Sequence, residues 1–188
     1  MSKRTQSDEE KELRDSWCTP EWVWRAPLEA LGIAEYDTDP CSNEWSTVPA
    51  KVKYTKADNG LDKPWGRYVW LNPPYSRPLL GQFMQQAFRR TVMDQTTEAV
   101  FALLPFAPGT AGWESSTPRY GIIIPRLSFT PPPGVGASPP GPVPHALCLY
   151  TMYDTDGEAP GIMHTMCNYI ECKRPGRLNG TQHWIITP

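Results

Sequence analysis

The chain has 188 residues, of which 39% are hydrophobic and 11% aromatic, so it is long and apolar enough to form a folded domain with a sizeable core. Its formal net charge of −2 gives no overall electrostatic attraction to nucleic acid, so any such contact must come from local patches. The sequence contains no apolar run of the roughly 18 residues that a membrane helix needs, and its N-terminal residues are polar and charged, which predicts a soluble cytoplasmic protein.

The five cysteines have irregular spacing and an odd number, which is not typical of a disulfide framework. Cys167 and Cys172 lie near His164 and His183 in the sequence, but their spacing matches no common zinc site. We therefore expect free thiols in a reducing compartment and no bound metal.

Residues 18–32 carry the signals of a helix. Thr19 is a candidate N-cap, and Pro20 fits the first helical position. Apolar residues follow at helical spacing, and Gly32 is suited to end the segment. Pro27 is expected to kink or shorten this helix.

The central part of the chain predicts a βαβ unit. Residues 34–42 are predicted to form a short strand that ends in a turn with Asp37 and Asp39. Residues 67–71 are a second strand candidate, rich in aromatic and branched residues, and 99–105 is a near-continuous apolar run typical of a buried strand. Residues 79–92 place apolar side chains at three- and four-residue steps, which indicates a helix. Ligands bind beyond the carboxyl ends of strands in such sheets, so the turn within "WLNPPYS" (70–76) is a candidate site.

Later segments predict two more strands, at 120–125 and 144–150, separated by a loop at 131–144 that consists mostly of proline and glycine. Residues 151–188 have no clear period, and we expect an irregular extension there. The predicted organisation is a flexible charged tail (1–15), one main domain (16–150) and an extension (151–188) that packs on the same domain.

The turn after the second predicted strand has a distinctive set of hydrogen-bond acceptors. Pro73 and Pro74 have fixed φ angles and no N–H groups, so the Asn72 side-chain oxygen and the Pro73 carbonyl are available as neighbouring acceptors. Tyr75 adds a flat aromatic face. This combination suits an aromatic amino group, whose nitrogen becomes a better nucleophile when both its hydrogens are held. An ordinary strand-ending turn is the alternative interpretation.

The order of several short segments resembles the phage and prophage DNA N6-adenine methyltransferases, the phage Dam-type family. The resemblance covers about residues 16–150 and rests on this ordered set: "TPEW" (19–22), "DTDPCS" (37–42), "KADNGL" (56–61), "VWLNPPY" (69–75) and "ALLP" (102–105). After "ALLP" the chain retains Thr110 and Trp113, but it lacks the charged residues that the family tends to have there.

The resemblance implies a Rossmann-like α/β methyltransferase with a mostly parallel sheet and a C-terminal antiparallel hairpin. It further implies S-adenosylmethionine as methyl donor and adenine in DNA, expected to be double-stranded, as acceptor. A phage origin would place the protein in the host cytoplasm. The implied catalytic residues are Asn72, Pro73, Pro74 and Tyr75, and the implied cofactor-binding residues are Thr19, Pro20, Trp22, Asp39 and Asp58.

Each cofactor-binding assignment has a purely structural alternative. Asp39 and Asp58 are also typical turn residues. Thr19 is also a candidate helix cap, and Trp22 is also a candidate core aromatic. We expect the nearby Asp37 to face solvent.

Two other functions remain compatible with the sequence. One is methyl transfer to a different sp² amine: cytosine N4, adenine in RNA or a glutamine amide. The other is a nucleic-acid-binding protein that uses a decayed methyltransferase scaffold, which the missing charges after "ALLP" favour.

Overall fold

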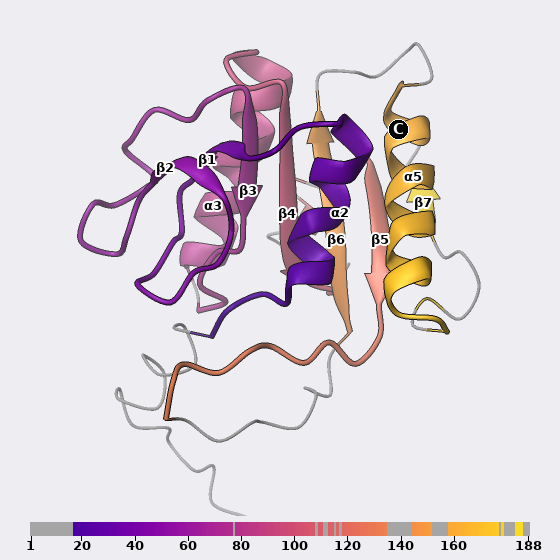
Figure 1. The fold of residues 1–188 in the computed structure, drawn as a ribbon. Coiled ribbons are helices and arrows are strands. Elements are labelled where there is room, and N and C mark those ends of the chain that lie inside the picture. Colours follow the sequence, from indigo (N-terminus) through magenta and orange to yellow (C-terminus); the bar gives the residue numbers. More distant parts are fainter. Residues whose placement is uncertain are drawn as a thin grey trace, which may run out of the picture.

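A computed structural model describes residues 17–76, 78–107, 109–110, 113–114, 116, 118–134, 144–151, 158–176, 178 and 183–185. These residues form a seven-stranded sheet with helices on both faces (Figure 1). The strand order is β2-β1-β3-β4-β6-β5-β7. The strands are β1 (Tyr36–Asp39), β2 (Ala50–Lys53), β3 (Tyr68–Leu71), β4 (Ala99–Pro105), β5 (Tyr120–Ile124), β6 (His145–Thr151) and β7 (His183–Ile185). The helices are α2 (Glu21–Leu31), α3 (Leu79–Phe88), the π-helical turn η1 (Arg89–Met93) and α5 (Glu158–Lys173).

The sheet is mixed, and five of its seven strands share one direction. Strands β1 to β4 pair in parallel, whereas β6 pairs antiparallel with both β4 and β5. Strand β5 therefore runs in the same direction as β4, and β7 runs against it. The expected mostly parallel sheet with an antiparallel pair toward the C-terminus is confirmed.

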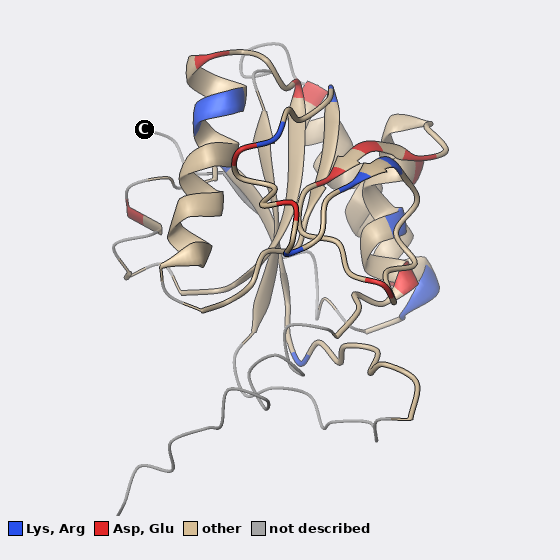
Figure 2. Cartoon of the chain, turned by 90° about the vertical axis from the view of Figure 1, so that its left-hand side faces the viewer, with Lys and Arg blue, Asp and Glu red and all other residues tan. Residues whose placement is uncertain are grey.

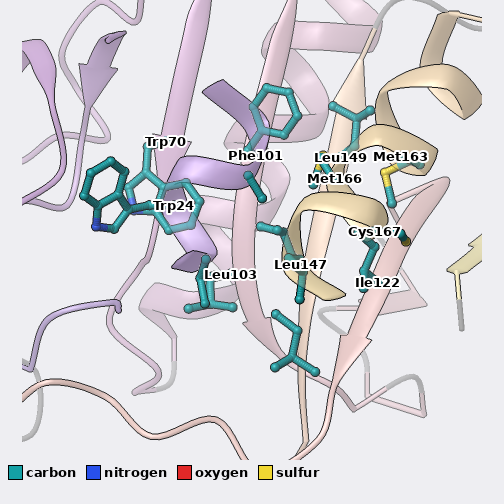
Figure 3. Close-up of a cluster of buried hydrophobic side chains, with 14 of the residues drawn as sticks. Trp24, Trp70, Phe101, Leu103, Ile122, Leu147, Leu149, Met163, Met166 and Cys167 are labelled. Carbon is teal, nitrogen blue, oxygen red and sulfur yellow. The ribbon is translucent and has the colours of Figure 1, made fainter. Parts of the chain in front are cut away.

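Strand β4 separates two apolar cores because its side chains alternate between the faces of the sheet. Phe101 and Leu103 point into the core that α2 and α5 cover. Val100, Ala102 and Leu104 point into the core that α3 covers. Figure 3 shows how side chains from α2, α5 and the central strands meet in the first core. The buried-strand prediction for 99–105 is confirmed, and the run is continuously apolar because both of its faces are covered.

The start of α2 differs from the prediction. Pro20 occupies the N-cap position, and the helix has no side-chain cap hydrogen bond, so the prediction that Thr19 caps it is wrong. Pro27 lies inside the helix, which nevertheless continues to Leu31. Gly32 ends it in the left-handed conformation with φ 65°, as predicted.

Two strands and a helix were not predicted. Strand β2 is short and half charged, a composition that is tolerated because it lies at the edge of the sheet. The prediction of an irregular extension over 151–188 is wrong, since this region contains the 16-residue helix α5 and strand β7. Helix α5 has a weak apolar period, but its buried side chains pack against α2 in the first core.

The predicted strand at 120–125 corresponds to β5, and that at 144–150 corresponds to β6. The charged tail at 1–15 and residues 135–143 of the Pro/Gly-rich loop lie outside the described residues. No helix in the described part of the chain is both long and apolar enough to span a bilayer.

Candidate functional site

The strand order places the ends of β1 and β3 side by side at a topological switch point. From β1 the chain moves outward to β2 and then returns to the other side of β1 as β3. Asp39 is the last residue of β1, and Asn72 directly follows β3. Open α/β sheets bind ligands at such a point, so the fold brings these two polar side chains to the expected edge.

The Asn72 side chain is fixed by two hydrogen bonds. Its Nδ2 donates to Thr19 Oγ1 at 3.1 Å, and its Oδ1 accepts from the Tyr75 hydroxyl at 3.0 Å. Thr19 is buried with 5% exposure, whereas Asn72 is half-buried. The amide is therefore held with its oxygen on the Tyr75 side, and that oxygen retains a second lone pair for a ligand.

Tyr75 lies among aromatic side chains from the end of the sheet. Its ring centroid is 6.3 Å from that of Phe129 and 5.6 Å from that of His145, and the hydroxyl reaches the Leu103 carbonyl at 3.4 Å. Burial raises the pKa of the Tyr75 phenol, so the hydroxyl stays protonated and acts as a donor to Asn72.

The two prolines continue the same rigid turn. Pro73 is buried and Pro74 is half-buried. Among the described residues, no N–H or hydroxyl group donates to the Pro73 carbonyl. This carbonyl and Asn72 Oδ1 are thus the acceptors that the turn offers.

The segment before α2 is joined to the segment after β5. Cys18 and Thr130 exchange two backbone hydrogen bonds of 2.8 Å, which form an isolated antiparallel bridge. This bridge holds Thr19 next to the turn at one end and Phe129 next to Tyr75 at the other (Figure 1 shows both segments at the lower end of the sheet).

Asp39 is a buried carboxyl group with few donors around it. Its exposure is 3%, its Oδ1 accepts from the Cys41 N–H at 3.1 Å, and its Oδ2 is 3.5 Å from the Ser46 hydroxyl. Burial raises its pKa to about 6, against the lowering effects of hydrogen bonds from Cys41, Ser42 and Ser46 and of the Lys53 charge. Such a carboxylate is stabilised by an additional donor, which a ligand can supply.

A family model described as DNA N-6-adenine-methyltransferase (Dam) matches residues 6–149. The chain belongs to the DNA N-6-adenine-methyltransferase (Dam) family.

Two phage proteins show the same relationship at moderate identity. Over 96 residues the chain is 38% identical to the DNA N-6-adenine-methyltransferase of Haemophilus phage HP1, covering 50% of this chain and 52% of the relative. Over 114 residues it is 44% identical to the DNA N-6-adenine-methyltransferase of Escherichia phage T1, covering 60% of this chain and 44% of the relative. The chain thus spans about half the length of these curated relatives.

Membership of the Dam family implies S-adenosylmethionine as methyl donor, and the side chains at the switch point fit that molecule. It carries an ammonium group, ribose hydroxyls and an exocyclic amine, all of which are hydrogen-bond donors. The buried Asp39 carboxylate is an acceptor that lacks strong partners on Oδ2. Asp39, the last residue of β1, is thus chemically suited to accept a hydrogen bond from such a donor.

The prediction that the neighbouring Asp37 faces solvent is wrong. Its carboxylate accepts from Lys51 Nζ at 2.6 Å and from the Tyr68 N–H at 2.9 Å, so it joins β1 to both adjacent strands. Partial desolvation raises its pKa, but these hydrogen bonds outweigh that effect and hold the pKa below its usual value. Asp37 is therefore a structural carboxylate.

The other predicted cofactor residues lie around the same end of the Dam-family fold. Asp58 is exposed, and its Oδ2 accepts from both the N–H and the hydroxyl of Thr55 at 2.8 Å. These hydrogen bonds lower the pKa of Asp58. Trp22 is half-buried against the first core, and Pro20 precedes the first turn of α2. Their roles in binding the cofactor remain predictions.

The site also contains residues that sequence reasoning missed. His145, Phe129 and Cys18 contact the turn or the segments that hold it, and no local pattern in the sequence marks these three residues. His145 stands at the start of β6, opposite Pro105 at the end of β4. An antiparallel neighbour contributes its first residue to the edge where parallel strands end, and the strand order was needed to see this.

Proposed function

We propose that this protein transfers a methyl group from S-adenosylmethionine to the N6 amino group of adenine in DNA. The observation that carries the proposal is the fixed amide of Asn72, whose oxygen accepts from the Tyr75 hydroxyl at 3.0 Å. Asn72 follows β3, which pairs with the strand that ends in the buried Asp39. Family membership supports the same substrate and donor.

The proposed role of the turn is to hold the target amine. Asn72 Oδ1 and the Pro73 carbonyl accept its two hydrogens, which leaves the nitrogen lone pair directed out of the ring plane. The nitrogen is thereby oriented and made more nucleophilic without a general base. The nitrogen forms its bond to the methyl carbon as the carbon–sulfur bond breaks, which leaves a neutral thioether. The proton on the methylated nitrogen, now strongly acidic, then passes to water.

S-adenosylmethionine supplies an electrophilic methyl group on a sulfonium when bound. Asp39 is the proposed acceptor for its donor groups, with Thr19, Pro20, Trp22 and Asp58 as the other proposed contacts. Thr19 has a second task here, because its hydroxyl oxygen accepts from Asn72 Nδ2. The residue thus links the cofactor side of the site to the amine side.

The target base has to leave the duplex to reach this turn, since its amino group is inaccessible while stacked. Tyr75 offers an aromatic ring at the turn for the extruded base. Four basic side chains of the described residues already form ion pairs at the surface: Arg25, Lys51, Arg67 and Arg89 pair with Glu21, Asp37, Glu98 and Asp94. Figure 2 shows such blue and red segments next to one another on the same helices and loops.

The test uses Asn72→Ala and Tyr75→Ala in the full chain, with Asn168→Ala on the exposed face of α5 as control. Both site variants are expected to bind S-adenosylmethionine normally and to lose DNA methylation by at least 100-fold, as measured by transfer of labelled methyl groups. Asn168→Ala should retain full activity. Full activity in Asn72→Ala would refute the assignment.

The choice of amine is tested separately, because cytosine N4, adenine in RNA and a glutamine amide present the same sp² nitrogen to the turn. Mass spectrometry of nucleosides and of tryptic peptides from cells that express the protein separates these products. We expect added N6-methyladenine in DNA, absent from cells that express Asn72→Ala. Methylation confined to RNA, cytosine or glutamine would replace the proposed substrate with that one.

A decayed, non-catalytic scaffold is the candidate from another class. It predicts weak or absent binding of S-adenosylmethionine, whereas the proposed function predicts binding that depends on Asp39. Calorimetry with wild-type protein and Asp39→Asn distinguishes them. Absence of heat in both proteins, with tight DNA binding retained, would favour the scaffold.

A further inference from the structure

The His145 imidazole has a buried ring nitrogen that forms no hydrogen bond with any described residue. The residue is 7% exposed, and among the described residues its Nδ1 has neither donor nor acceptor. A buried polar atom without a partner costs free energy, and such atoms persist where a ligand satisfies them.

His145 lies next to Tyr75, which belongs to the turn that is proposed to hold the amine. Its ring centroid is 5.6 Å from that of Tyr75 and 5.1 Å from that of Phe129, so the imidazole is part of the same aromatic group. Strand pairing fixes it there, because His145 lies opposite Pro105 at the end of β4 and opposite Ile124 at the end of β5. The side chain therefore lies beside the residue that bonds Asn72.

Burial also determines the protonation state of the His145 imidazole. Desolvation lowers the pKa of His145 to about 4, so the imidazole is neutral at physiological pH. A neutral imidazole has one N–H donor and one acceptor nitrogen. It can thus donate a single hydrogen bond to an uncharged acceptor without bringing a charge into the aromatic group.

We propose that His145 is a specificity-determining residue whose Nδ1–H donates to a ring nitrogen adjacent to the amine of the target base. In adenine, N1 is bonded to the amino-bearing carbon and N7 is bonded to the next ring carbon, so an acceptor lies on each side of the amino group. A glutamine amide has no such ring nitrogen, so His145 would select a heteroaromatic substrate. The inference rests on the proposed function and adds a contact on the ring to the contacts on the amine.

A site with a buried donor rejects analogues that lack the matching acceptor, because the donor is then left without a partner. The test therefore combines His145→Phe, which keeps a flat ring but no nitrogen, with DNA containing 7-deazaadenine or 1-deazaadenine in place of adenine. His164→Phe on exposed α5 is the matched control. Methyl transfer is measured as kcat/KM for every pair of protein and DNA.

We expect one of the two analogues to lower kcat/KM of the wild-type and His164→Phe proteins by about tenfold or more, and to have no further effect on His145→Phe. The analogue that shows this coupling identifies N1 or N7 as the acceptor. His145→Phe should bind S-adenosylmethionine with unchanged affinity, which also reports that it is folded.

Equal losses on both analogues in wild type and His145→Phe would overturn the inference while leaving the proposed function intact. So would full activity and unchanged substrate preference in His145→Phe. A wild-type protein that binds S-adenosylmethionine but methylates no adenine would overturn the proposed function itself, and this inference with it. If His145→Phe fails to bind the cofactor, His145→Gln, which retains an N–H donor, must restore activity for the inference to stand.

Discussion

Thr19 and Asn72 are 53 positions apart in the sequence and are joined by a hydrogen bond of 3.1 Å from Asn72 Nδ2 to Thr19 Oγ1. Together with the hydrogen bond from the Tyr75 hydroxyl to Asn72 Oδ1, this bond holds the amide with its oxygen toward Tyr75. An amide held this way presents its oxygen, not its NH₂ group, as the free acceptor. The segment before α2 thus orients the proposed catalytic side chain.

Replacing Thr19 with valine should lower kcat for methyl transfer by roughly tenfold, since loss of a buried hydrogen bond costs about 1–1.5 kcal/mol. The shape of the side chain is nearly preserved, so KM for S-adenosylmethionine should change less than kcat. Thr19→Ser keeps the hydroxyl and should restore most of the rate. A variant in which valine and serine behave alike would show that the hydroxyl does not position Asn72.

Asp39→Asn should weaken cofactor binding and stabilise the fold at neutral pH. The pKa of Asp39 is raised from 3.8 to about 6, so the ionised carboxylate is disfavoured in the folded protein by on the order of 3 kcal/mol at pH 7 and above. The contribution of the protonated Asp39 carboxyl to the stability of the fold is complete below pH 4, and it is lost as pH rises through 6. Asparagine does not ionise, so the gain in Tm over wild type should grow between pH 4 and pH 8.

Binding of S-adenosylmethionine should weaken in acid for the same reason. A donor on the ligand stabilises ionised Asp39, whose fraction falls below pH 6 because the pKa of the free protein is about 6. We expect the association constant to decline below that pH, toward tenfold per pH unit, in calorimetric titrations. The Asp39→Asn variant provides the control, since its weaker binding should not show this transition.

Asp37→Asn is expected to have the opposite pattern. The pKa of Asp37 is lowered, so its contribution to stability is present above the unfolded-state pKa and is lost as pH falls through the folded value. The variant should therefore have a lower Tm than wild type at neutral pH and a similar Tm in strong acid. Cofactor affinity at pH 7 should be unchanged, in contrast to Asp39→Asn.

Gly60 and Gly81 form a matched pair for testing a close backbone approach. A Cβ on Gly60 would lie 2.0 Å from the Pro40 carbonyl oxygen, whereas a Cβ on Gly81 would meet no atom within 4 Å. Gly60→Ala should lower the free energy of unfolding by roughly 1–3 kcal/mol, because the backbone next to Asp39 must move. Gly81→Ala, inside α3, should raise it by about 0.5–1 kcal/mol. Equal effects in denaturant titrations would contradict the close approach.

Some helices and strands could be predicted from the sequence because a short stretch of residues specifies each of them. The apolar run of β4, the apolar face of α3 and the left-handed end of α2 at Gly32 follow from side-chain period and backbone preference. Strand β2 and helix α5 could not be predicted in this way. Their own periods are weak, and each is stabilised by its neighbours, β1 for the strand and α2 for the helix.

The roles of the two aspartates of β1, Asp37 and Asp39, could not be separated from the sequence either. Both stand in one short segment, and their residue type alone does not separate a structural from a functional role. Asp37 meets Lys51 and the Tyr68 backbone, whereas Asp39 is buried with weak donors. Their opposite pKa shifts depend on which strands lie on either side, and that information is tertiary.

The sequence by itself determined the rigid "NPPY" turn, its two acceptors and its place after a strand, because prolines fix the backbone through local covalent geometry. The tertiary structure alone decided that Thr19 orients Asn72, and that His145 lies beside Tyr75. Such contacts join segments that are distant in the chain, and they exist only once the strand order and the Cys18–Thr130 bridge bring those segments to one edge of the sheet.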